Sequence, residues 1–302
     1  MSTAARKILL ATEVSAAVVP ELRAAANVSA RTGAPVRLVH VGSDIPAPSH
    51  WNDPTTSDAS FAQKGRERLD EQIGEIEARG GTVADSFGVP GESPGHEVVE
   101  LTRDEDVGLV VVGDRDLDRF RYASRASVPA HVVRDADCPV MVVRGSHFER
   151  DHEASETLRF PRTVLFATDG SRESALAARS AVEMGGEGSA LHVIHVYQDD
   201  VGGEHKAREI LDEQAGHIHE AGGTVSGVHP RQGQTVEEIL KLGEELEAEF
   251  VVVGGQGVGS MRELVPGTVS GAIVRDADRT VLVVRADREE KPLVDSPEVS
   301  VT

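Results

Sequence analysis

The sequence predicts an α/β chain of two tandem, doubly wound domains, each built on a five-stranded parallel sheet. Three observations predict this fold: the length, an internal repeat, and the alternation of strand-like and helix-like segments within each copy of the repeat. With 302 residues, the chain is long enough for two domains that each bury their own core. Apolar residues make up 39% of the chain, which fits a globular protein.

The internal repeat consists of four matched segments that occur in the same order in both halves. The pairs are KILLATEVS (7–15) with TVLFATDGS (163–171), RLDEQIGEIEARGGTV (68–83) with ILDEQAGHIHEAGGTV (210–225), LVVVGDRD (109–116) with FVVVGGQG (250–257), and VRDADCPVMVVR (133–144) with VRDADRTVLVVR (274–285). This period is too long for a solenoid repeat and fits a duplicated domain. We therefore expect domains at residues 1–146 and 160–286, joined by a polar linker, and a charged, disordered tail at 287–302.

Strands and helices alternate throughout the second copy. Continuous apolar runs such as TVLFAT indicate strands buried on both faces, and stretches with helical character that end in glycine indicate helices. The expected strands cover 163–168, 190–196, 224–230, 249–254 and 280–285, and the expected helices cover 172–187, 204–221, 235 onward and 268–277. Such alternation implies parallel strands joined by right-handed crossovers.

A glycine-rich segment after the fourth strand of the second copy is the strongest candidate for a binding site. It reads GGQG at 254–257, then nine residues, then Gly267 and Thr268. Glycines at the end of a parallel strand let backbone N–H groups approach a phosphate. Thr268 is placed to cap the following helix, whose N-terminus attracts anions. Asp169 follows the first strand and reaches the same edge, where open α/β sheets bind ligands.

This spacing resembles that of the universal stress protein family. Its ATP-binding members carry Gly-x-x-Gly, nine residues and Gly-Ser/Thr, with an aspartate after the first strand. The resemblance covers nearly the whole chain, twice, apart from the linker and the tail. It implies a Rossmann-like fold of the adenine nucleotide alpha hydrolase type, with strand order 3-2-1-4-5 and fifth strands that pair across a dimer interface. In this chain, PVMVVR and TVLVVR would pair as an internal pseudo-dimer, with a further homodimer left open.

The resemblance also implies which residues of the second copy bind an adenine nucleotide, taken as ATP with Mg²⁺ as the companion of its phosphates. Asp169 would contact the adenosine part, and the backbone of Val196 would contact the adenine. The glycines and Thr268 would hold the phosphates. The complete implied set is Ala167, Thr168, Asp169, Val196, Val253, Gly254, Gly257, Gly267, Thr268, Val269 and Ser270.

The first copy departs from the family spacing at each key position. Glu13 replaces the aspartate, and Ala126 and Ser127 replace the Gly-Thr pair. The loop reads Gly-Asp-Arg-Asp, so that Asp114 and Asp116 bring negative charge to the place where phosphates would bind. We expect the first copy to bind no ATP and to serve a structural or interaction role.

Other chemistries receive less support from the sequence. His192 and His195 are three residues apart in a strand and face opposite sides, so we expect no metal site there. We expect His40 and His195 to pack at strand ends, and Cys138 to be a small buried side chain. The sequence spacing suggests no catalytic arrangement of a nucleophile with a base, such as Ser-His-Asp. We therefore name no catalytic residue and expect at most slow ATP hydrolysis. The alternative function is a nucleotide-independent protein–protein interaction module.

The charge balance is strongly acidic. Asp and Glu total 51 against 31 Lys and Arg, a net charge of −20, and only five of the basic residues are lysine. At molar ionic strength the screening length falls to about 3 Å, so this composition favours a halophilic, haloarchaeal origin. The same charge disfavours nucleic acid as a partner. No apolar run suits a membrane span, and the N-terminal stretch fits a strand rather than a signal peptide, so we expect a cytoplasmic protein.

Overall fold

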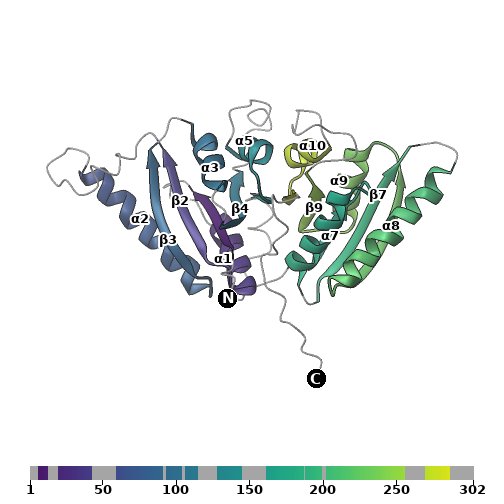
Figure 1. Ribbon diagram of the computed structural model, residues 1–302, viewed down its shortest axis with the longest axis horizontal. Coiled ribbons are helices and arrows are strands. Elements are labelled where there is room, and N and C mark those ends of the chain that lie inside the picture. Colours follow the sequence, from purple (N-terminus) through teal and green to yellow (C-terminus); the bar gives the residue numbers. More distant parts are fainter. Residues whose placement is uncertain are drawn as a thin grey trace, which may run out of the picture.

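The computed structural model describes residues 6–12, 20–42, 59–90, 93–103, 106–114, 128–144, 161–186, 188–198, 202–255 and 269–285. Two α/β halves lie side by side, and helices flank the strands of each half (Figure 1). The expected tail at 287–302 lies outside the described residues.

Both halves contain alternating strands and helices, as the repeat predicts. The first half comprises β1 (Lys7–Thr12), α1 (Pro20–Thr32), β2 (Val36–Gly42), α2 (Ala59–Ala78), β3 (Val83–Pro90), α3 (Pro94–Thr102), β4 (Val107–Asp114), α5 (Val128–Asp135) and β5 (Val140–Arg144). The second comprises β6 (Thr163–Ala167), α7 (Arg172–Gly185), β7 (Ala190–Tyr197), α8 (Gly203–Glu220), β8 (Val225–Gln232), α9 (Thr235–Glu245), β9 (Phe250–Gly254), α10 (Val269–Asp276) and β10 (Thr280–Val284). Each element expected in the second copy is present, with small shifts at its ends.

The ten described strands form one sheet in the order β3-β2-β1-β4-β5-β10-β9-β6-β7-β8. Within each half the neighbours are parallel and follow the expected order 3-2-1-4-5. At the junction β5 and β10 pair antiparallel, with Met141 opposite Leu282. This pairing forms the internal pseudo-dimer, and it covers two edge strands that the halves would otherwise expose.

Two hydrophobic layers, one on each face of the sheet, run through both halves. One layer lies under α1, α2, α7 and α8, and the other lies under α3, α5, α9 and α10. Met141 and Leu282 belong to the first layer, and Val142 and Val281 belong to the second. All four side chains are almost fully buried at the junction. The halves therefore share a core, which couples their stability.

An arginine of α1 closes the junction on one face of the sheet. Arg31 donates from Nη1 to the Met184 carbonyl at 2.7 Å and from Nη2 to the Glu183 carbonyl at 2.8 Å. These carbonyls lie in the last turn of α7, where a helix leaves acceptors without partners. Burial lowers the pKa of Arg31 to about 10, against the opposite effect of the Glu183 charge, so Arg31 is cationic at neutral pH. Charge-assisted bonds of this kind contribute about 1.5–3 kcal/mol each.

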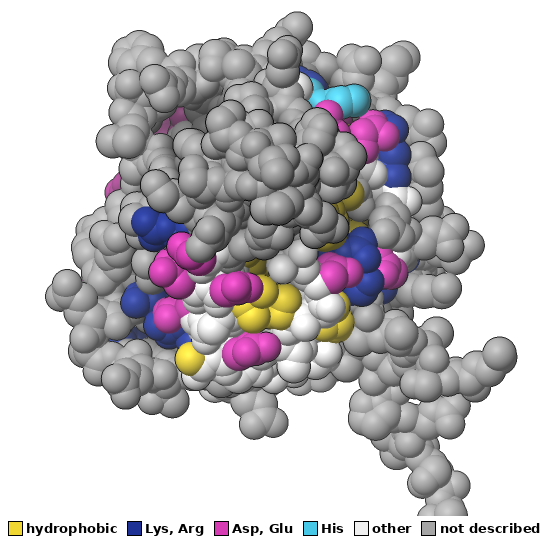
Figure 2. Space-filling view, turned by 90° about the vertical axis from the view of Figure 1, so that its left-hand side faces the viewer, with side chains coloured by type: hydrophobic (Ala, Val, Ile, Leu, Met, Phe, Trp, Pro, Cys, Tyr) yellow, Lys and Arg dark blue, Asp and Glu magenta, His cyan; other side chains and the backbone are white. Residues whose placement is uncertain are grey.

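The surface of the first half carries mixed charge. Lys7 Nζ lies 2.7 Å from an Asp106 oxygen, and Arg37 Nε lies 3.0 Å from Asp85 Oδ1. Figure 2 shows basic and acidic side chains next to one another on the face that it presents. In these pairs the basic side chain is partly buried and the carboxylate is more exposed, so solvent still screens the attraction. Among the described helices, none combines the length and the apolar character that a membrane crossing needs.

Two histidines pair where β7 meets the outermost strand β8. His192 Nδ1 lies 3.0 Å from His229 Nε2, so His192 faces a histidine of the neighbouring strand. Burial lowers the pKa of both imidazoles. For His229, the charges of His192 and Arg231 lower the pKa further, whereas Glu245 raises it. Both rings therefore favour the neutral form, which the ring that accepts this hydrogen bond must have.

We predict that this pair makes the fold sensitive to acid. Because folding depresses both pKa values below the ordinary 6.5, the unfolded chain binds more protons, and stability is lost as the pH falls through and below that value. In the first half, Phe87 stands at the register position of His229, so His229→Phe introduces a residue that the fold already accepts there. The variant should lose less stability than the parent at low pH. Urea unfolding of both proteins at about pH 7.5 and pH 5.5 measures it. An equal loss of stability in the parent and the variant would contradict the prediction.

Candidate functional site

The expected nucleotide site lies at the edge where the carboxyl ends of β6, β7 and β9 meet. Register places Ala167 beside Ile194 on one side and beside Val253 on the other. The Thr168 N–H continues the ladder by donating to the Ile194 carbonyl at 3.0 Å. The described members of the expected set are Ala167, Thr168, Asp169, Val196, Val253, Gly254, Val269 and Ser270. The remaining three, Gly257, Gly267 and Thr268, lie outside the described residues.

Asp169 is anchored to the first turn of α7. Its Oδ1 accepts a hydrogen bond from the Ser171 N–H at 3.0 Å and another from Ser174 Oγ at 2.8 Å. Ser171 is the N-cap of α7, and its Oγ accepts from the Ser174 N–H. Asp169 is nevertheless exposed. The carboxylate is thus held in one direction and is accessible to a ligand whose hydroxyl groups can donate to it.

A glycine with a left-handed backbone follows Asp169. Gly170 has φ +78°, a region that L side chains rarely adopt, and an added Cβ would lie 3.1 Å from a methyl of Ile210 in α8. The first copy has Val14 at this place in the sequence. A β-branched residue such as valine would be strained at the positive φ of Gly170. The turn that presents Asp169 therefore depends on Gly170.

His195 joins the end of β7 to the end of β6. Its Nδ1 lies 2.8 Å from the Thr168 carbonyl, and since a carbonyl only accepts, Nδ1 carries the proton. The first half repeats this contact, because His40 Nδ1 lies 2.8 Å from the Thr12 carbonyl. The two histidines therefore stabilise equivalent strand ends: His195 lies next to the expected site, and His40 lies at the matching edge of the first half.

Gly254 brings the end of β9 against the N-terminus of α7. The nearest neighbours of a Cβ added at Gly254 would be backbone atoms of Glu173 and Ser174, both at 3.8 Å. These atoms belong to the first turn of α7, whose N–H groups favour negative charge. Because the Ser171 and Ser174 N–H groups already donate to Asp169 Oδ1 and Ser171 Oγ, Gly254 offers a ligand an open strand end beside this turn rather than a free helix N-terminus.

The first half fills the corresponding space with a carboxylate. Gly113 is the counterpart of Gly254, and a Cβ added there would lie only 2.5 Å from Glu21 Oε1. Glu21 lies in the first turn of α1 and is 8% exposed. Counted from the aligned first strands, it stands where the second half has the buried Ala177. The first half thus places its own carboxyl group beside the strand end.

Sequence reasoning missed Glu21 and assigned the added charge to the loop. Asp114 ends β4, while Asp116, Glu13, Ala126 and Ser127 lie outside the described residues. The signal for Glu21 is that it is the one acidic residue among the buried residues of a helix that otherwise buries proline, leucine, alanine, valine and one serine.

The remaining candidates are structural. Burial raises the pKa of the Cys138 thiol to about 12, which removes it as a nucleophile at neutral pH. Its counterpart Arg279 is also buried and donates to the carbonyls of Gly243 and Ala248, the second at 2.9 Å. Within the described ranges, no three His, Cys, Asp or Glu side chains are arranged to hold a metal ion.

Comparison with known proteins places this geometry in a family. The model of the universal stress protein family matches residues 4–144 and again residues 161–285. A universal stress protein of Mycolicibacterium smegmatis is 27% identical over 296 residues, which cover 92% of this chain and 96% of that protein.

A solved structure shows the same fold over nearly the whole chain. The crystal structure of a universal stress protein from Archaeoglobus fulgidus covers 94% of this chain and 97% of its own, with 22% identity and a TM-score of 0.65. Another universal stress protein, 26% identical over 42% of this chain with a TM-score of 0.37, was solved in complex with cAMP. On the evidence of both matched segments and the shared fold, the chain belongs to the universal stress protein family, with two tandem family domains.

Proposed function

We propose that the chain binds one adenine nucleotide, ATP, in its second half and acts as a regulatory protein of the stress response. One observation carries the proposal: the complete Gly-x-x-Gly, nine-residue, Gly-Thr spacing begins at Gly254, where the end of β9 meets the N-terminus of α7. Membership in the family supports the same assignment.

Each residue of the proposed site has a role suited to its chemistry. Asp169 accepts hydrogen bonds from the nucleoside, and the backbone of Val196 contacts the adenine. The phosphates bind the glycine N–H groups, the Thr268 hydroxyl and the start of α10 at Val269 and Ser270. Ala167, Thr168 and Val253 shape the floor of the site from the ends of β6 and β9.

Mg²⁺ fits this site only as a companion of the nucleotide. Most of the proposed phosphate contacts are N–H groups, which cannot coordinate a cation, and the Thr268 hydroxyl is assigned to a phosphate, whereas Mg²⁺ requires several oxygen ligands. Asp169 is the one carboxylate among the proposed contacts, and its Oδ1 already accepts two hydrogen bonds. The ion would therefore bind through the phosphates.

The first half has a different proposed role. Glu21 beside Gly113 opposes an anionic ligand by like charge, and the loop that follows lacks the family glycines. The domain at 1–146 therefore has a structural or interaction role beside the domain at 160–286, while a nucleotide-independent interaction module remains the alternative function of the whole chain.

We predict that purified protein carries at most one nucleotide per chain. Denaturation followed by mass spectrometry should release an adenine nucleotide, and titration calorimetry with ATP should give a stoichiometry of about one, because one half alone keeps the spacing. Two equivalent nucleotides per chain would rule out the assigned asymmetry.

Gly254→Ala should weaken ATP binding while leaving the fold intact. The added methyl makes only ordinary protein contacts at 3.8 Å, but it stands where backbone N–H groups must approach the phosphate. We expect an affinity loss of about tenfold or more. The matched control is Gly216→Ala in α8, where an added Cβ meets nothing within 4 Å. If both variants bind ATP like the parent, the site is misplaced.

We also propose that the chain works in the cytoplasm of a halophile, since its net charge is −20. Repulsion among these charges is screened within about 3 Å at molar salt and persists over about 30 Å at 0.01 M. We predict that circular dichroism in about 10 mM salt shows partial unfolding that molar KCl reverses. A fully folded, cooperative protein in low salt would count against halophily.

A further inference from the structure

Two arginines occupy equivalent positions at the ends of the paired strands. Arg144 ends β5 and Arg285 directly follows β10, and each closes the same segment of its copy of the repeat. Because β5 and β10 run antiparallel, the end of each strand lies beside the start of the other. Each arginine therefore lies next to the opposite half. A pseudo-two-fold axis of this kind makes contacts reciprocal.

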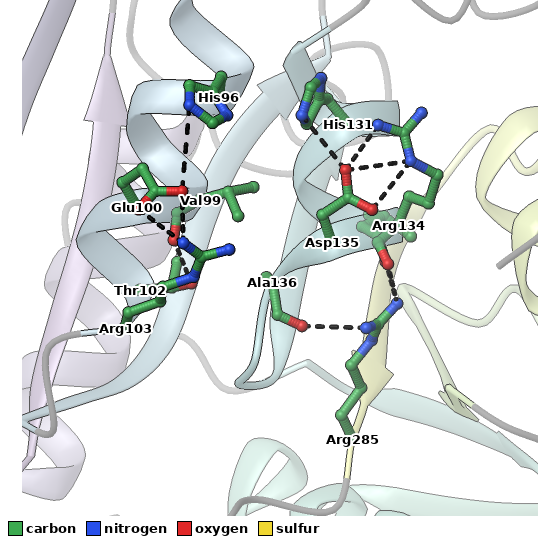
Figure 3. Close-up of polar contacts among 11 residues, drawn as sticks. His96, Val99, Glu100, Thr102, Arg103, His131, Arg134, Asp135, Ala136 and Arg285 are labelled. Carbon is green, nitrogen blue, oxygen red and sulfur yellow. Dashed lines mark hydrogen bonds and ion pairs between the residues drawn. The ribbon is translucent and has the colours of Figure 1, made fainter. Parts of the chain in front are cut away.

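Arg285 holds the C-terminal end of α5 in the first half (Figure 3). Its Nη2 donates to the carbonyls of Val133 at 2.5 Å and Arg134 at 2.8 Å, and Nη1 donates to the Ala136 carbonyl at 3.0 Å. Burial lowers the pKa of Arg285, whereas Asp135 and Asp137 raise it. Three carbonyls at one helix end thus accept hydrogen bonds from one cation, whose charge also interacts favourably with the negative end of the helix dipole.

Arg144 makes the reciprocal contact in the second half. Its Nη2 donates to the carbonyl of Val274, the counterpart of Val133 in the repeat. Arg144 is 6% exposed, so this bond lies in the junction rather than at its rim. Val274 lies in α10, whose first residues, Val269 and Ser270, belong to the proposed phosphate site.

Arg285 also touches the other flank of that site. A Cβ added at Gly255 would lie 2.7 Å from Arg285 Cγ and 3.4 Å from Nε. The Gly255 N–H donates to the Val284 carbonyl at 2.6 Å, which fixes the chain just beyond Gly254 against β10. The two flanks of the glycine-rich segment therefore each rest on one interdomain arginine.

We propose that Arg144 and Arg285 are positioning residues for the nucleotide site, so that the first half holds both flanks of a site that the second half provides. This proposal rests on the proposed function and adds its regulation. If the halves separate, Arg144 no longer binds the Val274 carbonyl of α10. Arg285, which packs against Gly255, loses the α5 carbonyls that hold it in place. By linkage, if the intact junction raises the affinity for the nucleotide by some factor, bound nucleotide raises the equilibrium constant for junction formation by the same factor.

The test measures ATP affinity by calorimetry in the full chain, with Arg144→Ala as the main variant. Arg144 belongs to the first half and is not among the proposed nucleotide contacts, yet we expect its loss to weaken ATP binding about tenfold. Arg144→Lys, which keeps a cationic N–H donor, should recover part of the affinity. Arg31→Ala is the matched control, because Arg31 of α1 binds carbonyls in the last turn of α7, more than two turns from the Ser174 that anchors Asp169, whereas Val274 lies about one turn from Ser270. It should lower the unfolding temperature and change ATP affinity less than about twofold.

Amide hydrogen exchange along α10 in the nucleotide-free protein gives a second readout. Exchange at Ala277, whose N–H donates to the Ile273 carbonyl at 2.8 Å, should be faster in Arg144→Ala and unchanged in Arg31→Ala. Unchanged ATP affinity in Arg144→Ala, or an equal loss in Arg31→Ala, overturns the coupling and leaves the proposed function standing. A parent chain that binds no adenine nucleotide overturns the proposed function, and the positioning role with it.

Discussion

The antiparallel pairing of β5 with β10 is the constraint on which the rest of the structure depends. It joins two five-stranded sheets into one and carries both hydrophobic layers across the junction through Met141, Leu282, Val142 and Val281. Each strand is buried along its whole length, so either half alone would expose an apolar edge. Duplication within one chain replaces the second subunit of a dimer, and loop closure costs less free energy than association of separate chains.

Covalent duplication also allows the two halves to diverge while the junction stays symmetric. The reciprocal bonds of Arg144 and Arg285 keep the two-fold pattern, and His40 and His195 brace equivalent strand ends. The carboxyl edges differ, because a Cβ added at Gly113 would lie 2.5 Å from the Glu21 carboxyl oxygen, whereas one added at Gly254 would meet only the backbone and Cβ of the first turn of α7, at 3.8 Å or more. We interpret this as a division of labour in which one half offers a site and the other half supports it.

Much of the fold could be predicted from sequence, because parallel strands buried on both faces leave continuous apolar runs and glycines mark the helix ends. The contact of Glu21 with Gly113 could not, since it depends on which face α1 turns toward β4. The His192–His229 pair depends on a register shift between β7 and β8. The arginine contacts join residues 130 or more positions apart, and only the pairing of β5 with β10 brings them together. Local pattern carries no information on such distances.

The central claim is that one half binds a nucleotide and the other fills the same place with its own carboxyl group, that of Glu21. A crystal structure grown with a slowly hydrolysed ATP analogue tests it most directly. The account predicts nucleotide density at the carboxyl ends of β6 and β9, beside Asp169 and Gly254, with the Glu21 carboxylate still against Gly113. Nucleotide bound in the first half with Glu21 displaced, or an empty edge beside Asp169 at saturating analogue, would contradict it.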